Sequence, residues 1–297
     1  MSLLVTGGSG FLGAWIIRQL LAAGEEVRLF DRSADRRLVE WIVGPDAARV
    51  EWICGDIADA DAVMAAATGT RRILHLAGVL TPACQADPLL GARVNLLGTL
   101  HVFEAARRLG HKAVIYTSSA GVFGPDDAEH PLPQTHYGTF KLACEGSARA
   151  YWHDHRIASI GFRPYVAYGP GREVGGTAGP SLAARAAAQG EAYTIPYSGR
   201  SGLVYVEDVA AAYVAAATRD LSGAHVVTMP GETVDSEEII AAIRRLVPDA
   251  AIGVAGAPLP IAPDLPASDI STLLPGVPQT GLAEGLARTI AFYRENR

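Results

Sequence analysis

A glycine-rich turn at the N-terminus constrains the fold more than any other stretch of the chain. Residues 1–13 read MSLLVTGGSGFLG, in which an apolar run at 3–5 is typical of a buried parallel strand and residues 14–23 carry apolar side chains at helical spacing. Gly7 permits the tight turn, Gly10 lets the backbone approach a pyrophosphate, and Gly13 lets the helix pack on the strand. The free N–H groups at the start of that helix then face an anion, although an ordinary strand-to-helix turn also fits the pattern.

An acidic residue at the end of the next strand supports the phosphate-binding interpretation. The apolar run 27–30 ends in Asp31, about twenty residues beyond the glycines, where a dinucleotide-binding unit places the acid that binds the adenosine ribose. A carboxylate there repels the extra phosphate of NADP, so we expect NAD as the cofactor. Arg32 follows directly and weakens that preference. The alternative is that Asp31 is simply a solvated strand end.

Composition and charge exclude several classes of function. A length of 297 residues suggests one large α/β unit with a smaller attached lobe. The net charge of −6 and the lack of a basic stripe argue against a nucleic-acid partner. The sequence has no basic leader followed by an apolar segment and no uncharged apolar run of membrane-spanning length, so we expect a soluble, cytoplasmic protein. Cys54, Cys84 and Cys144 and the eight histidines lack metal-ligand spacing, and we expect no metal.

Apolar strand runs alternate with helical patterns along the first half of the chain. This alternation predicts an α/β fold, a doubly wound parallel sheet of the Rossmann type with a smaller C-terminal substrate-binding lobe. The predicted strands are 2–6, 27–31, 50–54, 72–76, 113–118 and 157–163. Ligands of such sheets bind beyond the C-terminal ends of the strands, so the residues that follow each strand are the candidates for function.

Two strand ends supply further candidates for the cofactor site. After the third strand, Asp56 and Ile57 are placed to meet the adenine, and a helix N-cap explains Asp56 equally well. After the fourth strand, the small residues of Leu76-Ala77-Gly78 allow a cofactor to lie across the strand end. Asn95 lies in a predicted helix from about 89 to 109 and is either a satisfied core amide or part of a proton relay.

The fifth predicted strand leads to residues suited to acid–base chemistry. It ends in Thr117-Ser118-Ser119, and a proline-rich loop then leads to a helix that begins near Tyr137. Tyr137 and Lys141 are four residues apart and share one helical face. A lysine ammonium beside a phenol favours the phenolate, which makes Tyr137 a candidate general base. A serine hydroxyl at the strand end can hydrogen-bond the same substrate oxygen.

These motifs together resemble the extended short-chain dehydrogenase/reductase family, in its epimerase/dehydratase branch. GGSGFLG at 7–13 is similar to the family's TGGxGFxG fingerprint, which includes Phe11 and Leu12, and Tyr137 to Lys141 is similar to its YxxxK. NLLGT at 95–99, RP at 163–164, YGPGR at 168–172 and VYVEDVA at 204–210 match further family blocks in the same order. The resemblance covers nearly the whole chain. It implies that Ser119 is the catalytic hydroxyl, that Asn95 is functional, and that Pro164 to Val166 pass beside the nicotinamide.

The resemblance implies NAD-dependent hydride transfer at a secondary hydroxyl, commonly of a sugar, through Ser119, Tyr137 and Lys141. Release of the ketone gives a dehydrogenase and reduction on its other face gives an epimerase, and the sequence leaves these alternatives open. A dehydratase is disfavoured because Ala120-Gly121 stands where the family's dehydratases carry an Asp-Glu pair. A non-catalytic NAD-sensing protein is the remaining alternative. The family also implies a homodimer, formed through the helices near 90–109 and 137–153.

The substrate is the least determined part of the prediction. We expect a cofactor domain of residues 1–164 plus about 203–230, and a substrate lobe of about 165–202 plus 231–297. Relatives that bind nucleotide sugars carry an Arg-Asp-aromatic triplet where this chain has Ser-Gly-Leu at 201–203, which favours a smaller carbohydrate such as a free sugar, sugar acid or hydroxy acid. Arg172 and Arg200 are candidate anchors for a carboxylate or phosphate, or else surface salt bridges. Further candidates for the substrate pocket are Thr81, Ser119, Ala120, Tyr165 and Tyr197.

Overall fold

A seven-stranded parallel sheet forms the centre of the larger part of the molecule in a computed structural model, which describes residues 1–296. The strand order is β3-β2-β1-β4-β5-β6-β10, and every neighbouring pair is parallel. The strands are β1 (Leu3–Thr6), β2 (Val27–Asp31), β3 (Glu51–Cys54), β4 (Arg72–His75), β5 (Ala113–Thr117), β6 (Ala158–Pro164) and β10 (Ala224–Met229). The six predicted strands and the predicted fold class are confirmed, and β10 adds a seventh strand that we did not predict.

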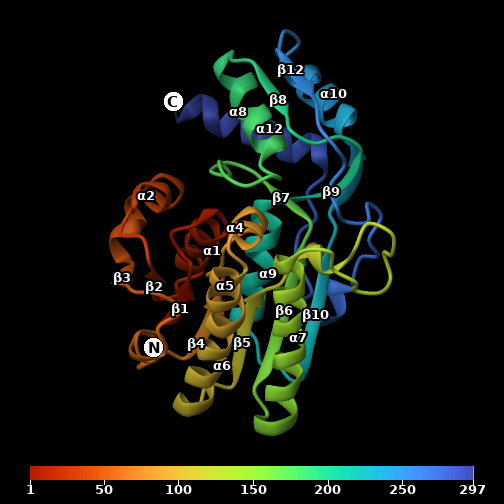
Figure 1. The fold of residues 1–297 in the computed structure, drawn as a ribbon. Helices are drawn as coiled ribbons and strands as arrows, with labels where there is room; N and C mark the ends of the chain where they lie inside the picture. The colour runs from red at the N-terminus through yellow and green to blue at the C-terminus, as the bar shows by residue number, and fades with distance from the viewer. Residues whose placement is uncertain (297) are drawn as a thin grey trace.

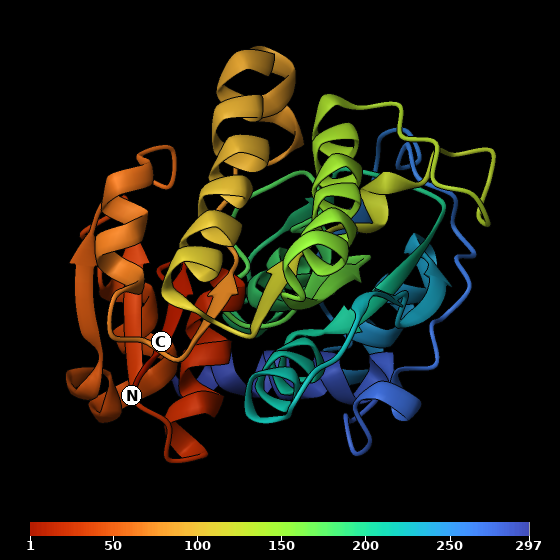
Figure 2. The same cartoon turned by 90° about the horizontal axis from the view of Figure 1, so that it is seen from below.

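Helices cover both faces of this sheet (Figures 1 and 2). One face carries α1 (Phe11–Ala22), α2 (Arg37–Val43) and α9 (Val206–Thr218). The opposite face carries α3 (Ala60–Ala67), α6 (Gly98–Leu109) and α7 (His136–His155), with the short α4 (Thr81–Ala86), α5 (Pro88–Gly91) and π-helical η2 (Ala92–Leu97) beside them. Alternate residues of β1 belong to different cores, since Leu3 and Val5 pack under α1 and Leu4 packs under α3 and α6. The two faces therefore have separate apolar cores, as a doubly wound sheet requires.

The smaller lobe lies at the C-terminal ends of the strands (Figure 1). A three-stranded sheet of β7 (Val166–Tyr168), β9 (Arg200–Tyr205) and β11 (Glu232–Asp235) joins it to the larger part. The rest consists of β8 (Tyr193–Ile195), β12 (Ile252–Val254), α8 (Gly179–Gln189), α10 (Ser236–Leu246), α11 (Ile270–Leu273) and α12 (Leu282–Glu295). All of β9 pairs within this sheet, and α9 of the larger part begins directly after it at Val206. Residue 297, the last of the predicted lobe, lies outside the described residues.

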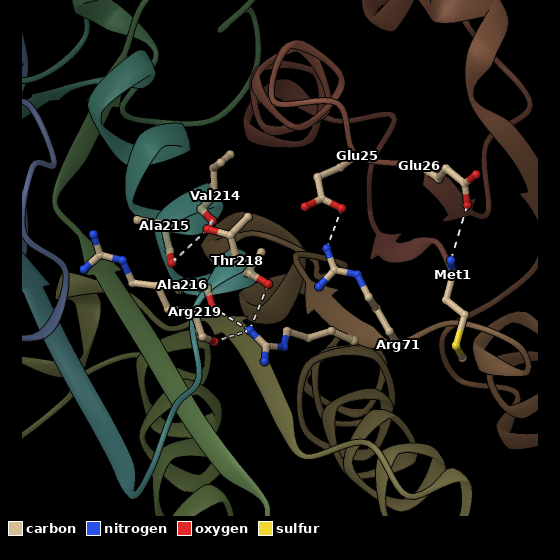
Figure 3. Close-up of polar contacts among 11 residues, drawn as sticks. Met1, Glu25, Glu26, Arg71, Val214, Ala215, Ala216, Thr218 and Arg219 are labelled. Atoms are coloured by element: carbon tan, nitrogen blue, oxygen red, sulfur yellow. Dashed lines mark hydrogen bonds and ion pairs between the residues drawn. The ribbon is translucent and has the colours of Figure 1, made fainter.

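Polar contacts fix the end of the large sheet that lies away from the lobe. Arg71 pairs with Glu25 across the strand starts, and the Met1 amino group lies 3.6 Å from a Glu26 carboxylate oxygen (Figure 3). Arg72 donates from Nη1 to the carbonyl oxygens of Ala216, Ala217 and Arg219, at 2.9, 2.8 and 2.6 Å. These carbonyls lie at the C-terminal end of α9, which offers no internal partners for them. The contacts hold α9 against β4 and leave the opposite end of the sheet, where the strands have their C-terminal ends, free for a site.

No helix within residues 1–296 is long and apolar enough to cross a membrane.

Candidate active site

A cleft of about 1170 Å³ lies between the two parts, beyond the C-terminal ends of β1, β2, β4, β5 and β6. The larger part lines it with the glycine turn, the ends of these strands and the start of α7, and the lobe lines it with Tyr165, Ala167 and residues 171–177 and 259–261. Sixteen of the predicted site residues line the cleft: Gly7, Gly10, Phe11, Leu12, Gly13, Asp31, Arg32, Asp56, Ile57, Leu76, Ala77, Gly78, Thr81, Ser119, Tyr137 and Lys141. Pro164, at the end of β6, also lines the cleft, and Tyr165 and Arg172 line its lobe side.

The glycine turn has the shape that a bound diphosphate needs. Gly7 has φ +70°, and a Cβ there would lie 2.5 Å from the Ala77 nitrogen. A Cβ on Gly13 would lie 2.5 Å from the Cα of Gly8, so α1 can approach the turn only with glycine at that position. The N-cap of α1 is Gly10, which has no side chain to occupy the free N–H groups of the first turn. These N–H groups therefore remain available to an anion, and the residues present fit a dinucleotide.

Two carboxylates line the cleft at the ends of β2 and β3. Asp31 accepts hydrogen bonds from the backbone N–H of Ser9 (3.2 Å) and of Ser33 (3.0 Å), which fixes its carboxylate at the end of β2. Asp56 accepts from the N–H of Ala58 at 2.9 Å in a local turn. The N-cap of α3 is Asp59, so the alternative interpretation of Asp56 as a helix cap is wrong. Both acids line the cleft, as expected of residues that bind ribose and adenine.

Tyr137, Lys141 and Ser119 converge on one wall of the cleft. Lys141 is buried, its Nζ lies 5.8 Å from the centroid of the Tyr137 ring, and it donates to the carbonyl of Thr117 at 2.7 Å. Ser119 Oγ accepts from the N–H of Gly121 at 3.0 Å, which leaves the serine hydrogen free to donate. Since an ammonium has three hydrogens, Lys141 keeps two after binding Thr117.

Close backbone packing brings this wall together. A Cβ on Gly138 would lie only 2.0 Å from the carbonyl oxygen of Gly121, so the first turn of α7 rests directly on the turn that contains Ser119. A Cβ on Gly121 would lie 3.2 Å from Ser119 Oγ and 3.7 Å from the Tyr137 ring. Ser119 and Tyr137 are therefore neighbours across Gly121, although they are eighteen positions apart in the sequence.

Asn95 does not reach the cleft, contrary to our expectation of a cofactor-binding residue. Its side chain is fully buried, accepts from the N–H of Val79 at 2.8 Å and donates to the carbonyl of Val79 at 2.9 Å. Its backbone carbonyl, inside the π-helical turn, accepts from Thr99 Oγ1 at 2.7 Å and from Cys144 Sγ at 3.3 Å. All these groups are satisfied by protein, so Asn95 supports the Gly78-Val79 backbone that lines the cleft.

A buried ion pair that we did not predict stabilises the cleft wall that carries Tyr137, Lys141 and Ser119. Glu145 is fully buried and accepts from Arg163 at 2.7 Å (Nε) and 2.5 Å (Nη2), and from Ser118 Oγ at 2.5 Å. The pair ties α7 to the ends of β5 and β6. Arg163 belongs to a motif that we noted only for its family resemblance, and no local pattern indicates that Glu145 is its partner.

The two candidate arginines of the lobe have different surroundings. Arg172 lines the cleft, and within residues 1–296 its side chain makes one hydrogen bond, from Nη2 to Thr177 Oγ1 at 3.1 Å. Its Nε is buried without a hydrogen-bond partner in the described part of the chain, and its guanidinium lies 5.5 Å from the centroid of the Phe11 ring. Burial lowers its pKa, and the Tyr137 phenol opposes this effect. Arg200 lies outside the cleft and pairs with Asp264 at 2.8 Å, so the salt-bridge alternative holds for Arg200.

Three further candidates do not line the cleft, because their side chains pack into the core. Ala120 and Val166 are buried in the larger apolar cluster, and Tyr197 is buried in the lobe. Tyr165, which does line the cleft, donates to the carbonyl of Ile261 at 3.1 Å. Sequence reasoning missed Trp41, the 173–177 loop and the 259–261 segment as lining residues. The glycines of the 173–177 loop could have indicated that loop, but the 259–261 segment carries no motif. Residues 1–296 hold no cluster of three or more potential metal ligands.

Comparison with known proteins agrees with this arrangement. The sequence model of the NAD dependent epimerase/dehydratase family matches residues 3–228. UDP-glucose 4-epimerase of Mycolicibacterium smegmatis is 30% identical over 99% of both chains. D-erythronate dehydrogenase of Cupriavidus necator is 31% identical over 84% of this chain and 83% of that protein.

A solved structure with the same fold contains the cofactor. The crystal structure of the Thermus thermophilus UDP-glucose 4-epimerase in complex with NAD superposes with a TM-score of 0.84, at 26% identity and 99% coverage of both chains. The family is NAD-dependent and the Thermus thermophilus structure contains NAD, and the glycine turn of this chain fits the same group. The chain therefore belongs to the NAD-dependent epimerase/dehydratase family of extended short-chain dehydrogenases/reductases, and its cofactor is NAD.

Proposed function

We propose that this enzyme oxidises a secondary hydroxyl of a sugar-derived substrate, with Tyr137 as the general base. The observation that carries the proposal is the convergence of Tyr137, Lys141 and Ser119 on one wall of the NAD-binding cleft. NAD, when bound, accepts the hydride that leaves the carbinol carbon.

The chain's own residues then manage the proton. The Tyr137 phenolate takes the proton of the substrate hydroxyl, and the buried Lys141 ammonium stabilises that phenolate. The hydroxyl hydrogen of Ser119, which its bond from Gly121 leaves free, is directed to the same substrate oxygen. The carbonyl of Thr117 holds Lys141 in place throughout.

We further propose that Arg172 binds an anionic group of the substrate. It is the least exposed of the three arginines that line the cleft, since Arg32 and Arg37 are exposed. The carboxylate of the neighbouring Glu173 pairs with Arg185 at 2.7 Å. A guanidinium in partly dry surroundings binds a carboxylate or phosphate in bidentate geometry.

The position of Arg172 in the cleft favours a small sugar acid over a nucleotide sugar as the substrate. Arg200, the other candidate for the diphosphate, is held by Asp264 outside the cleft. The relative that is a D-erythronate dehydrogenase carries the name of such an acid. An epimerase of nucleotide sugars remains the second candidate, because the M. smegmatis relative covers the full chain.

The test is absorbance at about 340 nm, the band of the reduced nicotinamide, with NAD and two substrate panels. Net NADH from sugar acids such as D-erythronate supports the dehydrogenase. A new isomer without NADH from UDP-sugars supports the epimerase. The Tyr137→Phe variant is expected to abolish turnover and keep NAD binding, whereas Tyr151→Phe, on the same helix and bonded to Glu104, serves as the matched control. Wild-type turnover by Tyr137→Phe would refute the assignment.

Arg172→Gln and Arg200→Gln form a second matched pair. We expect Arg172→Gln to raise KM for the acidic substrate roughly tenfold or more, as loss of a charged hydrogen bond predicts. Arg200→Gln should leave KM unchanged, because its partner and its position lie outside the cleft. An equal effect of both substitutions would contradict the role of Arg172.

A further inference from the structure

The peptide unit between Pro170 and Gly171 is held by side chains from two distant elements. Trp15 Nε1 in α1 donates to the carbonyl oxygen of Pro170 at 2.9 Å. The N–H of Gly171 donates to the hydroxyl oxygen of Tyr293 in α12, also at 2.9 Å. Both polar groups of this one peptide are therefore bound, one by the larger part of the molecule and the other by the C-terminal helix.

The surroundings of this peptide make both hydrogen bonds costly to lose. Trp15 and Tyr293 are each 2% exposed, and Gly171 is buried. Burial raises the pKa of Tyr293 to about 12, so its hydroxyl stays neutral. Gly171 has φ +87°, and a Cβ there would lie 2.9 Å from Leu38 in α2. In such dry surroundings, an amide or carbonyl that loses its partner has no water to replace it.

Aromatic packing holds both side chains, the donor Trp15 and the acceptor Tyr293, in place. Phe292 lies between the two parts, with its ring centroid 6.1 Å from that of Trp15 and 4.9 Å from that of Trp41. The Trp41 ring also lies 5.7 Å from that of Tyr293. In Figure 1, α12 belongs to the upper lobe and its C-terminal end extends toward the side where α2 lies. This cluster is the contact through which the C-terminal helix reaches α1 and α2.

The residue that follows the held peptide is Arg172. We propose that Trp15 and Tyr293 are positioning residues, which fix the Pro170–Gly171 peptide so that the Arg172 guanidinium stays in the cleft over Phe11. A long arginine side chain has many rotamers, and fixing the backbone at its root lowers the entropy lost when it binds an anion. The C-terminal helix thereby takes part in substrate binding although none of its residues lines the cleft.

The effect on substrate binding rests on the proposed role of Arg172. The clamp, by which we mean the two hydrogen bonds of Trp15 and Tyr293 to the Pro170–Gly171 peptide, is measurable without substrate. Hydrogen–deuterium exchange of the 169–178 segment, followed by mass spectrometry, reports the protection of the Gly171 amide. We expect Tyr293→Phe to speed exchange of that amide roughly tenfold, because it removes the acceptor and keeps the ring. Tyr151→Phe, which removes a hydroxyl bonded to Glu104 and makes no bond to the peptide, is the control and should leave the Gly171 amide near its wild-type rate. Unchanged exchange in Tyr293→Phe would overturn the proposal.

The second arm tests whether the clamp acts through Arg172. D-gluconate serves as the anionic probe, titrated calorimetrically into the NAD-loaded enzyme. We expect Tyr293→Phe and Trp15→Phe each to weaken its binding about three- to tenfold, while the affinity for NAD stays the same. In an Arg172→Gln background, Tyr293→Phe should have no further effect, because the interaction it supports is already absent.

The outcomes separate this inference from the proposed function. A further loss of affinity from Tyr293→Phe in the Arg172→Gln background would show a merely structural role and overturn the positioning assignment. Tight gluconate binding that Arg172→Gln does not weaken would refute the anion anchor, while the exchange rates would still decide whether the peptide is clamped.

Discussion

Replacement of Glu145 by glutamine tests how the cleft wall that carries Ser119, Tyr137 and Lys141 is held in place. The carboxylate is fully buried and binds Arg163 through both oxygens and Ser118 through one. Glu145→Gln keeps the size and shape of the side chain but removes its charge. The Arg163 side chain, 12% exposed, is then left as a nearly buried cation without a counter-ion.

The expected cost follows from that unpaired charge. Removal of one partner of a buried ion pair typically costs about 3–5 kcal/mol. Arg163 keeps some access to water and lies 5.0 Å from the centroid of the Phe123 ring, which also stabilises a cation, so we expect about 3 kcal/mol. An unfolding entropy of about 2.1 cal/mol/K per residue gives roughly 0.6 kcal/mol/K for 297 residues. The expected fall in Tm is therefore roughly 5 °C.

Thermal unfolding followed by circular dichroism measures this shift. The double variant Glu145→Gln with Arg163→Met should recover part of the loss, because it removes the stranded charge. Glu284→Gln is the control, since Glu284 pairs with Arg288 on the surface and such pairs contribute at most about 1 kcal/mol. A Tm for Glu145→Gln within a degree of wild type, or a double variant less stable than the single one, would refute the reasoning.

Three further outcomes are expected. Asp31→Ala should weaken NAD and relax discrimination against NADP, as paired binding titrations would reveal; tighter NADP binding by the wild type would contradict the role of Asp31. Gly138→Ala, whose Cβ would lie 2.0 Å from the Gly121 carbonyl oxygen, should lower kcat by displacing α7 while NAD affinity changes little; wild-type kcat would show that the wall tolerates the shift. Burial, and then the Lys141 charge, lowers the pKa of His75 from 6.5 to about 3, so the unfolded chain binds a proton that the folded chain excludes. Neutral His75 therefore makes its full contribution to the free energy of unfolding above pH 6.5. This contribution is lost as pH falls toward 3, and roughly 2 kcal/mol of it is lost at pH 5. Denaturant unfolding at pH 7 and 5 should show this extra loss in the wild type and not in His75→Gln, and equal pH dependence would exclude His75 as its source.

Features with short-range signals were predicted from the sequence. The glycine turn, Asp31 and the Tyr137 to Lys141 pair depend on spacings within one strand–helix unit, and the structure places all of them at the cleft. The strand β10 was missed, because a half-buried edge strand after a long crossover has no sequence signal beyond a few apolar residues. Asn95 was assigned to the cofactor, whereas its amide is used by the backbone of Val79, a contact sixteen residues away.

The sequence by itself determined six of the seven strands and the cofactor, and it singled out Tyr137 and Lys141 as candidate acid–base residues, since each follows from the periodicity or spacing of neighbouring residues. Arg172 and Arg200 were equal candidates in the sequence, and only the tertiary structure distinguished them. Arg200 pairs with Asp264, whereas no carboxylate pairs with Arg172 within residues 1–296. The ion pair of Glu145 with Arg163 and the bonds of Trp15 and Tyr293 to a single peptide were likewise decided by folding. The bonds to that peptide join residues more than a hundred positions apart, and no local pattern records which distant side chain a polar group will find.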